Sequence, residues 1–231
     1  MANDSAMVIV AHPDDAEFLA GGATALWTRD GKEVIYVIVT NGDKGSEDPD
    51  ITSEELAAVR RVEQQQAADG LDVAKVLFLG YEDGMLEPSL DLRRDLARVI
   101  RTHVPHTVVT FDPTVRFITD NYPNHPDHRA TGDATLDAVF PAARDRLTFP
   151  ELLAEGLTPH KVREVWLGAG SRANHWVDIE PVLSKKIAAL KKHESQLADM
   201  DLDEFIPQMA KDSAKGSPYT YAEGFRRVVL D

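Results

Sequence analysis

The chain has 231 residues, of which 43% are hydrophobic and 28% charged, a composition typical of a globular protein with an ample core. Its 39 acidic and 25 basic side chains give a formal net charge of −14, which repels phosphate backbones and anionic lipid and so disfavours nucleic acid and membrane surfaces as partners. Because there is no cysteine, disulfides and iron–sulfur clusters are excluded, and any metal site must use histidine nitrogens and carboxylate oxygens.

Short apolar runs alternate with helical patterns along the chain. The clearest helical pattern begins at Thr52, where Glu55 completes a capping box, and continues to about Asp69. The apolar runs are typical of buried strands and cover residues 7–11, 34–40, 75–79, 107–111 and 162–167. This alternation predicts an α/β fold, a Rossmann-like, doubly wound, mainly parallel sheet with helices on both faces and ligands at the carboxyl ends of its strands.

The remaining segments carry weaker patterns. Residues 112–124 lack apolar periodicity and lead into a histidine motif, so we expect a functional loop there. Leu183, Ile187 and Leu190 mark one stripe of a further helix, near which His193 is expected to be packed, and residues 201–231 read as a polar tail. The longest apolar run, residues 34–39, is too short to span a bilayer, and no secretory signal pattern is present. We therefore expect one domain over residues 1–231, located in the cytoplasm.

The first polar cluster follows the first predicted strand and reads His12-Pro13-Asp14-Asp15. Residues three apart at the start of a helix can share one face, so His12 and Asp15 can reach one metal ion while Asp14 is left to act on a bound water. The alternative is an ordinary strand-to-helix turn in which one of the aspartates caps the helix.

The second cluster follows the fourth strand and its loop and reads His125-Pro126-Asp127-His128. One of the two histidines can bind a metal while the other contacts a substrate oxygen, although a solvated loop is the simpler alternative. Asp127 is either a partner of a histidine ring or a helix cap. Together the clusters favour a His-Asp-His site with an open position for water, as in catalytic zinc sites.

These residues resemble the LmbE-like, or PIG-L, family of de-N-acetylases, whose signatures occur here at residues 12–15 and 125–128. The resemblance covers nearly the whole chain and includes Arg60 and Glu63 and the segments 40–45, 80–84 and 192–196. It implies Zn²⁺ held by His12, Asp15 and His128. It also implies a homo-oligomer, a trimer or hexamer, that acts on an N-acetylated amino sugar or a conjugate of one.

The resemblance also implies a mechanism. Asp14 is the general base for attack of zinc-bound water on the acetamide carbonyl, and protonated His125 holds the oxyanion. Either of these two groups can protonate the leaving amine. Arg60 and Asp83 are implied substrate binders, against the simpler interpretations of Arg60 and Glu63 as a surface ion pair and of Asp83 as a turn residue. Some relatives have a tyrosine nearer the histidine than Tyr122, so the resemblance does not assign a catalytic role to Tyr122.

The favoured hypothesis is thus a zinc-dependent hydrolase that removes acetyl from an N-acetylglucosamine-like compound. The first alternative is an amidase that cleaves a larger acyl group or a thiol conjugate of an amino sugar with the same metal site. A nucleotide-binding module is ranked last, because the first strand is followed by His-Pro-Asp-Asp and not by the Gly-x-Gly-x-x-Gly turn. A purely structural zinc is disfavoured, because it would have four protein ligands.

Overall fold

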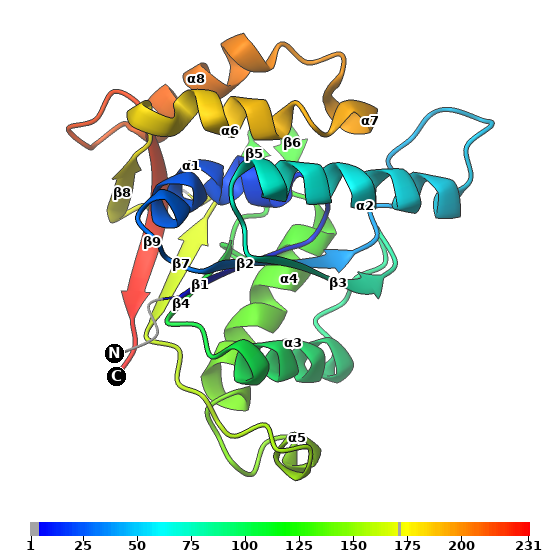
Figure 1. The fold of residues 1–231 in the computed structure, drawn as a ribbon, viewed down its shortest axis with the longest axis vertical. Coiled ribbons are helices and arrows are strands. Elements are labelled where there is room, and N and C mark those ends of the chain that lie inside the picture. The colour runs from blue at the N-terminus through cyan, green and yellow to red at the C-terminus, as the bar shows by residue number, and fades with distance from the viewer. Residues whose placement is uncertain (1–4, 171) are drawn as a thin grey trace.

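The fold is organised around a seven-stranded sheet with the order β3-β2-β1-β4-β7-β9-β8 (Figure 1). The structure is a computed structural model and describes residues 5–170 and 172–231. The strands from β3 to β7 pair in parallel, whereas β9 pairs antiparallel with β7 and with β8. The strands of this sheet are β1 (Ala6–Val10), β2 (Val34–Thr40), β3 (Lys75–Tyr81), β4 (Thr107–Phe111), β7 (Glu164–Gly168), β8 (His175–Asp178) and β9 (Ala222–Val229).

Helices cover both faces of this sheet. One layer consists of α1 (Asp15–Arg29), α2 (Ser53–Gly70), η2 (Glu180–Val182), α6 (Leu183–Leu190), α7 (Glu194–Leu197) and α8 (Leu202–Ser213). The opposite layer consists of α3 (Leu90–His103), α4 (Pro126–Asp137), η1 (Ala138–Ala142) and α5 (Pro150–Ala154). Within the described part of the chain, no helix has the length and apolar content needed to cross a membrane.

The central strands are apolar throughout because both of their faces are buried. Val8 and Val10 of β1 contribute to the core under α1 and α2, whereas Met7 and Ile9 contribute to the core under α3 and α4. Alternating side chains of one strand therefore stabilise two layers, as expected for a parallel sheet. This confirms the predicted α/β class, and the predicted helix start is confirmed by the capping box at Thr52.

The predicted polar tail is wrong, because residues 201–231 contain α8 and β9. The charged residues of β9 made this segment look polar in the sequence, but two of them form ion pairs with other parts of the fold. Glu223 lies against Lys186 at 2.6 Å, and Arg227 pairs with Glu164 of the neighbouring β7. The predicted loop at residues 112–124 is also more ordered than expected, because it contains a small hairpin of β5 (Phe117–Thr119) and β6 (Tyr122–Pro123).

Helix α1 is interrupted at Ala20, whose φ of −145° is not helical. The Glu223 carboxylate accepts a hydrogen bond of 2.7 Å from the N–H of Gly22, just beyond the break. A Cβ at Gly22 would lie 2.4 Å from the side chain of Ile179, so glycine is needed for this close packing. The C-terminal strand thereby stabilises the second half of α1, beyond the break.

Candidate active site

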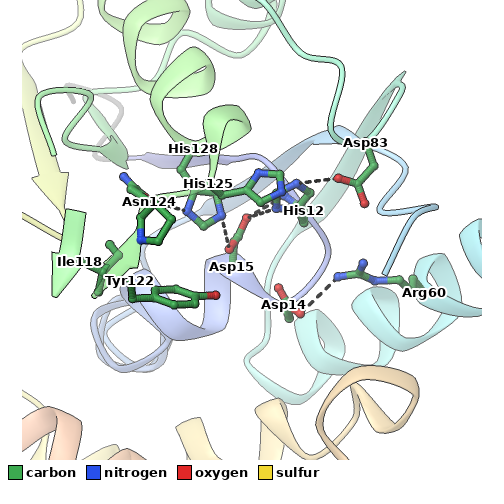
Figure 2. A pocket seen from close by; sticks show the side chains of 11 residues that line it. His12, Asp14, Asp15, Arg60, Asp83, Ile118, Tyr122, Asn124, His125 and His128 are labelled. Atoms are coloured by element: carbon green, nitrogen blue, oxygen red, sulfur yellow. Dashed lines mark hydrogen bonds and ion pairs between the residues drawn. The ribbon is translucent and has the colours of Figure 1, made fainter. Parts of the chain in front are cut away.

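A cavity of about 310 Å³ lies at the carboxyl ends of β1 and β4, where the strand order reverses (Figure 2). Ligands bind at this point in open α/β sheets. The cavity contains both histidine motifs, which are 110 or more residues apart in the sequence. It is lined by His12, Asp14, Asp15, Arg60, Asp83, Ile118, Tyr122, Pro123, Asn124, His125 and His128.

The first motif forms the turn from β1 into α1. The backbone N–H of His12 donates a hydrogen bond of 2.7 Å to Asp15, and the ring Nδ1 of His12 lies 3.2 Å from the same carboxylate. Asp14, between them, has a φ of +98°, a backbone conformation that non-glycine residues rarely adopt. This conformation separates the two carboxylates, so that Asp15 faces His12 while Asp14 faces Arg60 (Figure 2).

The second motif starts helix α4 and brings a second imidazole to the same carboxylate. His128 Nε2 lies 3.2 Å from Asp15, while its Nδ1 lies 3.2 Å from the side-chain oxygen of Asn124. The His128 ring also stacks on Phe111, the last residue of β4, with ring centres 4.2 Å apart. These contacts fix the orientation of His128, with Nε2 directed to Asp15.

His12, Asp15 and His128 together form a group that could hold a metal ion, with ligand atoms within 4.8 Å of one another. In a tetrahedral site with ligand distances of about 2.0–2.1 Å, neighbouring donor atoms are about 3.3 Å apart. Each imidazole has a nitrogen 3.2 Å from Asp15, close to this spacing, with His12 facing one oxygen of the carboxylate and His128 facing the other. Two imidazoles and one carboxylate also suit zinc and other divalent transition metals.

Asp127 lies directly behind His12. Its carboxylate is fully buried, is 3.2 Å from His12 Nε2, and accepts hydrogen bonds from the backbone N–H groups of Gly84 and Leu86. The helix cap that sequence reasoning left open for Asp127 is instead provided by the side chain of His125. Asp127 therefore orients the His12 ring and leaves Nδ1 free to face Asp15.

Asp83 also contacts His12 Nε2, at 3.1 Å. It is buried at the cavity wall and is not a simple exposed turn residue. Burial favours the neutral imidazole, but hydrogen bonds to Asp127, Asp15 and Asp83 outweigh it and raise the pKa of His12 well above its usual value. The pKa of Asp83 is lowered to about 2: burial opposes this shift, but the hydrogen bond and charge of His12 exceed it.

Asp14 lies in the same cavity, next to the three-residue metal group but not part of it. Burial raises its pKa to about 6, and the neighbouring charge of Asp15 adds to this rise, while Arg60 opposes it. Arg60 donates to the Asp14 carboxylate at 3.2 Å and to the backbone oxygens of Pro13 and Gly42. The alternative of a surface ion pair is wrong, because Arg60 is buried and Glu63 instead accepts hydrogen bonds from Ser195.

His125 lies at the rim of the cavity, with its ring 4.6 Å from that of His12. Burial and the charge of His12 lower the pKa of His125, which favours the neutral form of its ring. Its Nδ1 accepts the backbone N–H of Asp127 at 3.2 Å. A neutral ring with this contact carries its proton on Nε2 and can still donate a hydrogen bond.

Sequence reasoning missed several residues of the site. Asn124 and Phe111 fix His128, Ile118 lines the cavity on the hairpin side, and Gln64 accepts the backbone N–H of Asp14 at 3.0 Å. Tyr122, to which sequence reasoning assigned no role, lines the cavity beside Ile118. Asn124 directly precedes the second motif, which is a signal that sequence reasoning could have used. No local pattern distinguishes Gln64 from the other polar residues of its helix.

Comparison with known proteins shows which family the chain resembles. Residues 7–139 match the family model PIG-L, described as GlcNAc-PI de-N-acetylase. A diacetylchitobiose deacetylase of Thermococcus kodakarensis is 33% identical over 96% of this chain and 82% of its own length. A probable N-acetyl-α-D-glucosaminyl L-malate deacetylase of Bacillus anthracis is 29% identical over 83% of this chain and 81% of its own length.

The fold is also similar to a solved structure of this kind. The N,N′-diacetylchitobiose deacetylase of Pyrococcus horikoshii, in complex with an inhibitor, superposes with a TM-score of 0.91 and 31% identity. The superposition covers 98% of this chain and 84% of that one. A hydratase of Pseudomonas putida, 23% identical, superposes with a TM-score of 0.78 and shows the shared fold alone.

Proposed function

Because this chain belongs to the PIG-L family of GlcNAc-PI de-N-acetylases, we propose that it hydrolyses the acetamide bond of N-acetylglucosamine-like sugars or conjugates. One observation carries the proposal. A group of two histidines and an aspartate that fits a metal ion shares a cavity with Asp14, a carboxylate whose pKa is raised to about 6. This pairing is what metal-assisted amide hydrolysis requires.

We propose Zn²⁺ as the metal, with His12, Asp15 and His128 as its ligands. When bound, a divalent cation supplies Lewis-acid activation of a water molecule and of the amide carbonyl. The Asp14 carboxylate accepts a proton from the attacking water and returns it to the amine nitrogen as the carbon–nitrogen bond breaks, which releases acetate and the free amino sugar. Arg60 holds the Asp14 carboxylate for this transfer.

The other cavity residues bind and orient. His125 Nε2–H donates a hydrogen bond to the negative oxygen that develops on the carbonyl carbon. Arg60 and Asp83 line the same cavity and are proposed to bind sugar hydroxyls, beside their contacts to Asp14 and His12. Asp127 is proposed to act only through His12, because its carboxylate is fully buried.

The alternative is an amidase for a larger acyl group or thiol conjugate, and a second cavity next to the first supports it. This second cavity has a volume of about 620 Å³ and shares Ile118 with the catalytic cavity. Thr114 and Gly170 also line it. It offers room for a substrate part that the first cavity cannot hold.

The direct test is acetate release from N-acetylglucosamine and its short oligomers by metal-loaded protein, with a chelated sample and Asp14→Asn as controls. Turnover that both controls abolish supports the deacetylase. A metal-loaded protein that releases no acetate but cleaves larger acyl conjugates favours the amidase. A protein that neither binds metal nor turns over any of these substrates contradicts both proposals.

Three further predictions accompany the proposed function. The shared sheet of the two motifs supports one domain over residues 1–231. The cytoplasmic location and the trimeric or hexameric assembly rest on the sequence and on the family resemblance. Metal analysis of purified protein tests the proposed Zn²⁺. The mass of the protein in solution tests the proposed assembly.

A further inference from the structure

A buried chain of polar side chains runs from the C-terminal region to Asp14. His193 Nε2 contacts Glu17 at 3.2 Å, and the other oxygen of Glu17 accepts a hydrogen bond of 2.9 Å from the amide of Gln64. The carbonyl oxygen of the Gln64 side chain then accepts the backbone N–H of Asp14. Three side chains thus connect helix α1, helix α2 and the segment between α6 and α7.

The three side chains are shielded from solvent. Glu17, Gln64 and His193 are each 0% exposed, and they lie between the helices of one layer, where α6 packs on α1 and α2 (Figure 1). None of them lines the catalytic cavity. Burying such polar groups costs free energy unless they are hydrogen-bonded. Three buried polar side chains in an apolar layer are therefore less favourable than apolar side chains at the same positions.

The row of buried polar side chains ends at Asp14, the strained residue of the site. The φ of +98° at Asp14 is unfavourable for a residue with a side chain, at about 1–3 kcal/mol, and persists only if its surroundings fix it. The Asp14 carbonyl accepts hydrogen bonds from the first turn of α1, and its carboxylate is bound by Arg60. The N–H is the remaining polar group of the residue, and Gln64 fixes it.

We propose that Gln64, Glu17 and His193 are positioning residues that hold the Asp14 backbone in its positive-φ conformation and so keep its carboxylate at the reacting water. Gln64 contacts Asp14 directly. Glu17 fixes which end of the Gln64 amide faces Asp14, because it accepts from the NH₂ group. His193 anchors Glu17. This inference rests on the proposed role of Asp14 and extends the active site into the segment 192–196, for which the deacetylase mechanism has no other use.

The test compares Gln64→Leu, His193→Leu and His193→Gln in the metal-loaded full chain. Leucine removes the hydrogen bonds at similar volume, whereas glutamine at position 193 keeps an Nε2 donor for Glu17. We expect Gln64→Leu and His193→Leu to lower kcat by roughly 10–100-fold, as for other residues that orient catalytic groups, with KM and metal content unchanged. We expect His193→Gln to restore most of the lost kcat.

Glu223→Gln is the matched control. Glu223 is also a buried carboxylate that contacts α1, through Gly22 and Lys186, but it lies at the break of the helix and has no contact with Asp14 among the described residues. Its substitution lowers thermal stability while kcat, measured well below the unfolding temperature, stays unchanged. The control separates loss of stability from loss of positioning.

The result that overturns the inference is a kcat for His193→Leu that equals that of His193→Gln and of the control. If Gln64→Leu does not fold, the two variants at position 193 carry the comparison. A crystal structure of the His193→Leu protein gives a readout that does not depend on activity. A positive φ at Asp14 in that structure contradicts the inference even if the proposed reaction is wrong, and a changed φ supports it.

Discussion

The two histidine motifs differ only in their last residue, yet their corresponding residues have opposite surroundings. His12 is buried and faces the carboxylate of Asp15, whereas His125 has a ring at the cavity rim that caps helix α4. Asp14 lines the cavity with a positive φ, whereas Asp127 is fully buried against the backbone of the segment after β3. Only the last residue of each motif, Asp15 and His128, has the same proposed role, that of a metal ligand.

This difference shows that sequence spacing identifies candidate site residues, whereas the backbone conformation decides which of them faces the cavity. The residue after Pro13 is Asp14, whose positive φ turns its own carboxylate into the cavity. Pro126 occupies the first turn of a regular helix, where the next side chain, Asp127, points into the protein. The same three letters therefore produce a candidate base in one motif and a positioning carboxylate in the other.

The largest effect is expected from His12→Ala, compared with His125→Ala. His12→Ala removes a proposed ligand and should reduce bound metal and acetate release to background. His125→Ala should keep the metal and lower kcat by roughly 10²–10³-fold, the usual effect of losing an oxyanion donor. Metal content by atomic spectroscopy and acetate release on the same samples check both. Equal metal loss in the two variants would erase the distinction between the motifs.

The next effect concerns the two central aspartates. Asp14→Asn should keep its metal and lose roughly 10²–10⁴-fold in kcat, because the amide cannot accept the proton. Asp127→Asn should instead weaken metal affinity by roughly 10–100-fold, because it no longer orients His12 as a carboxylate. Competition with a chelator measures the affinity. A metal affinity that falls more in Asp14→Asn than in Asp127→Asn would reverse our assignment.

A smaller effect is expected for Arg60→Lys. Lysine cannot reach Asp14, Pro13 and Gly42 together, as the guanidinium does, so buried oxygens lose their donors. We expect the free energy of unfolding to fall by about 1–3 kcal/mol, with a reduced kcat at saturating substrate. Urea denaturation and steady-state kinetics measure the two changes. An unchanged kcat would show that Arg60 does not support the role of Asp14 in turnover.

The smallest effect is expected for Pro126→Ala. Alanine is compatible with the first turn of α4, so only the restriction of the unfolded chain is lost. We expect a loss of about 0.4–1 kcal/mol in the free energy of unfolding, with metal content and turnover unchanged. Thermal denaturation and acetate release check this. A loss of bound metal would show that this proline itself places His128.

The sequence by itself determined the five parallel strands of the sheet and the two histidine motifs of the site. Apolar runs such as residues 34–40 predict buried strands because both faces of a parallel sheet are covered, and the order of strands and helices then places both motifs at one edge. The family resemblance, carried by the same motifs, supplied the ligand choice of His128 over His125.

Only the tertiary structure decided the roles that depend on distant contacts. Strand β9 escaped prediction because Glu223 and Arg227 are charged residues whose partners, Lys186 and Glu164, are remote in sequence. In the same way, Gln64 is an ordinary helix residue until folding brings it to the N–H of Asp14. Local patterns report local propensity and burial, whereas the partner that satisfies a buried polar group is set by packing.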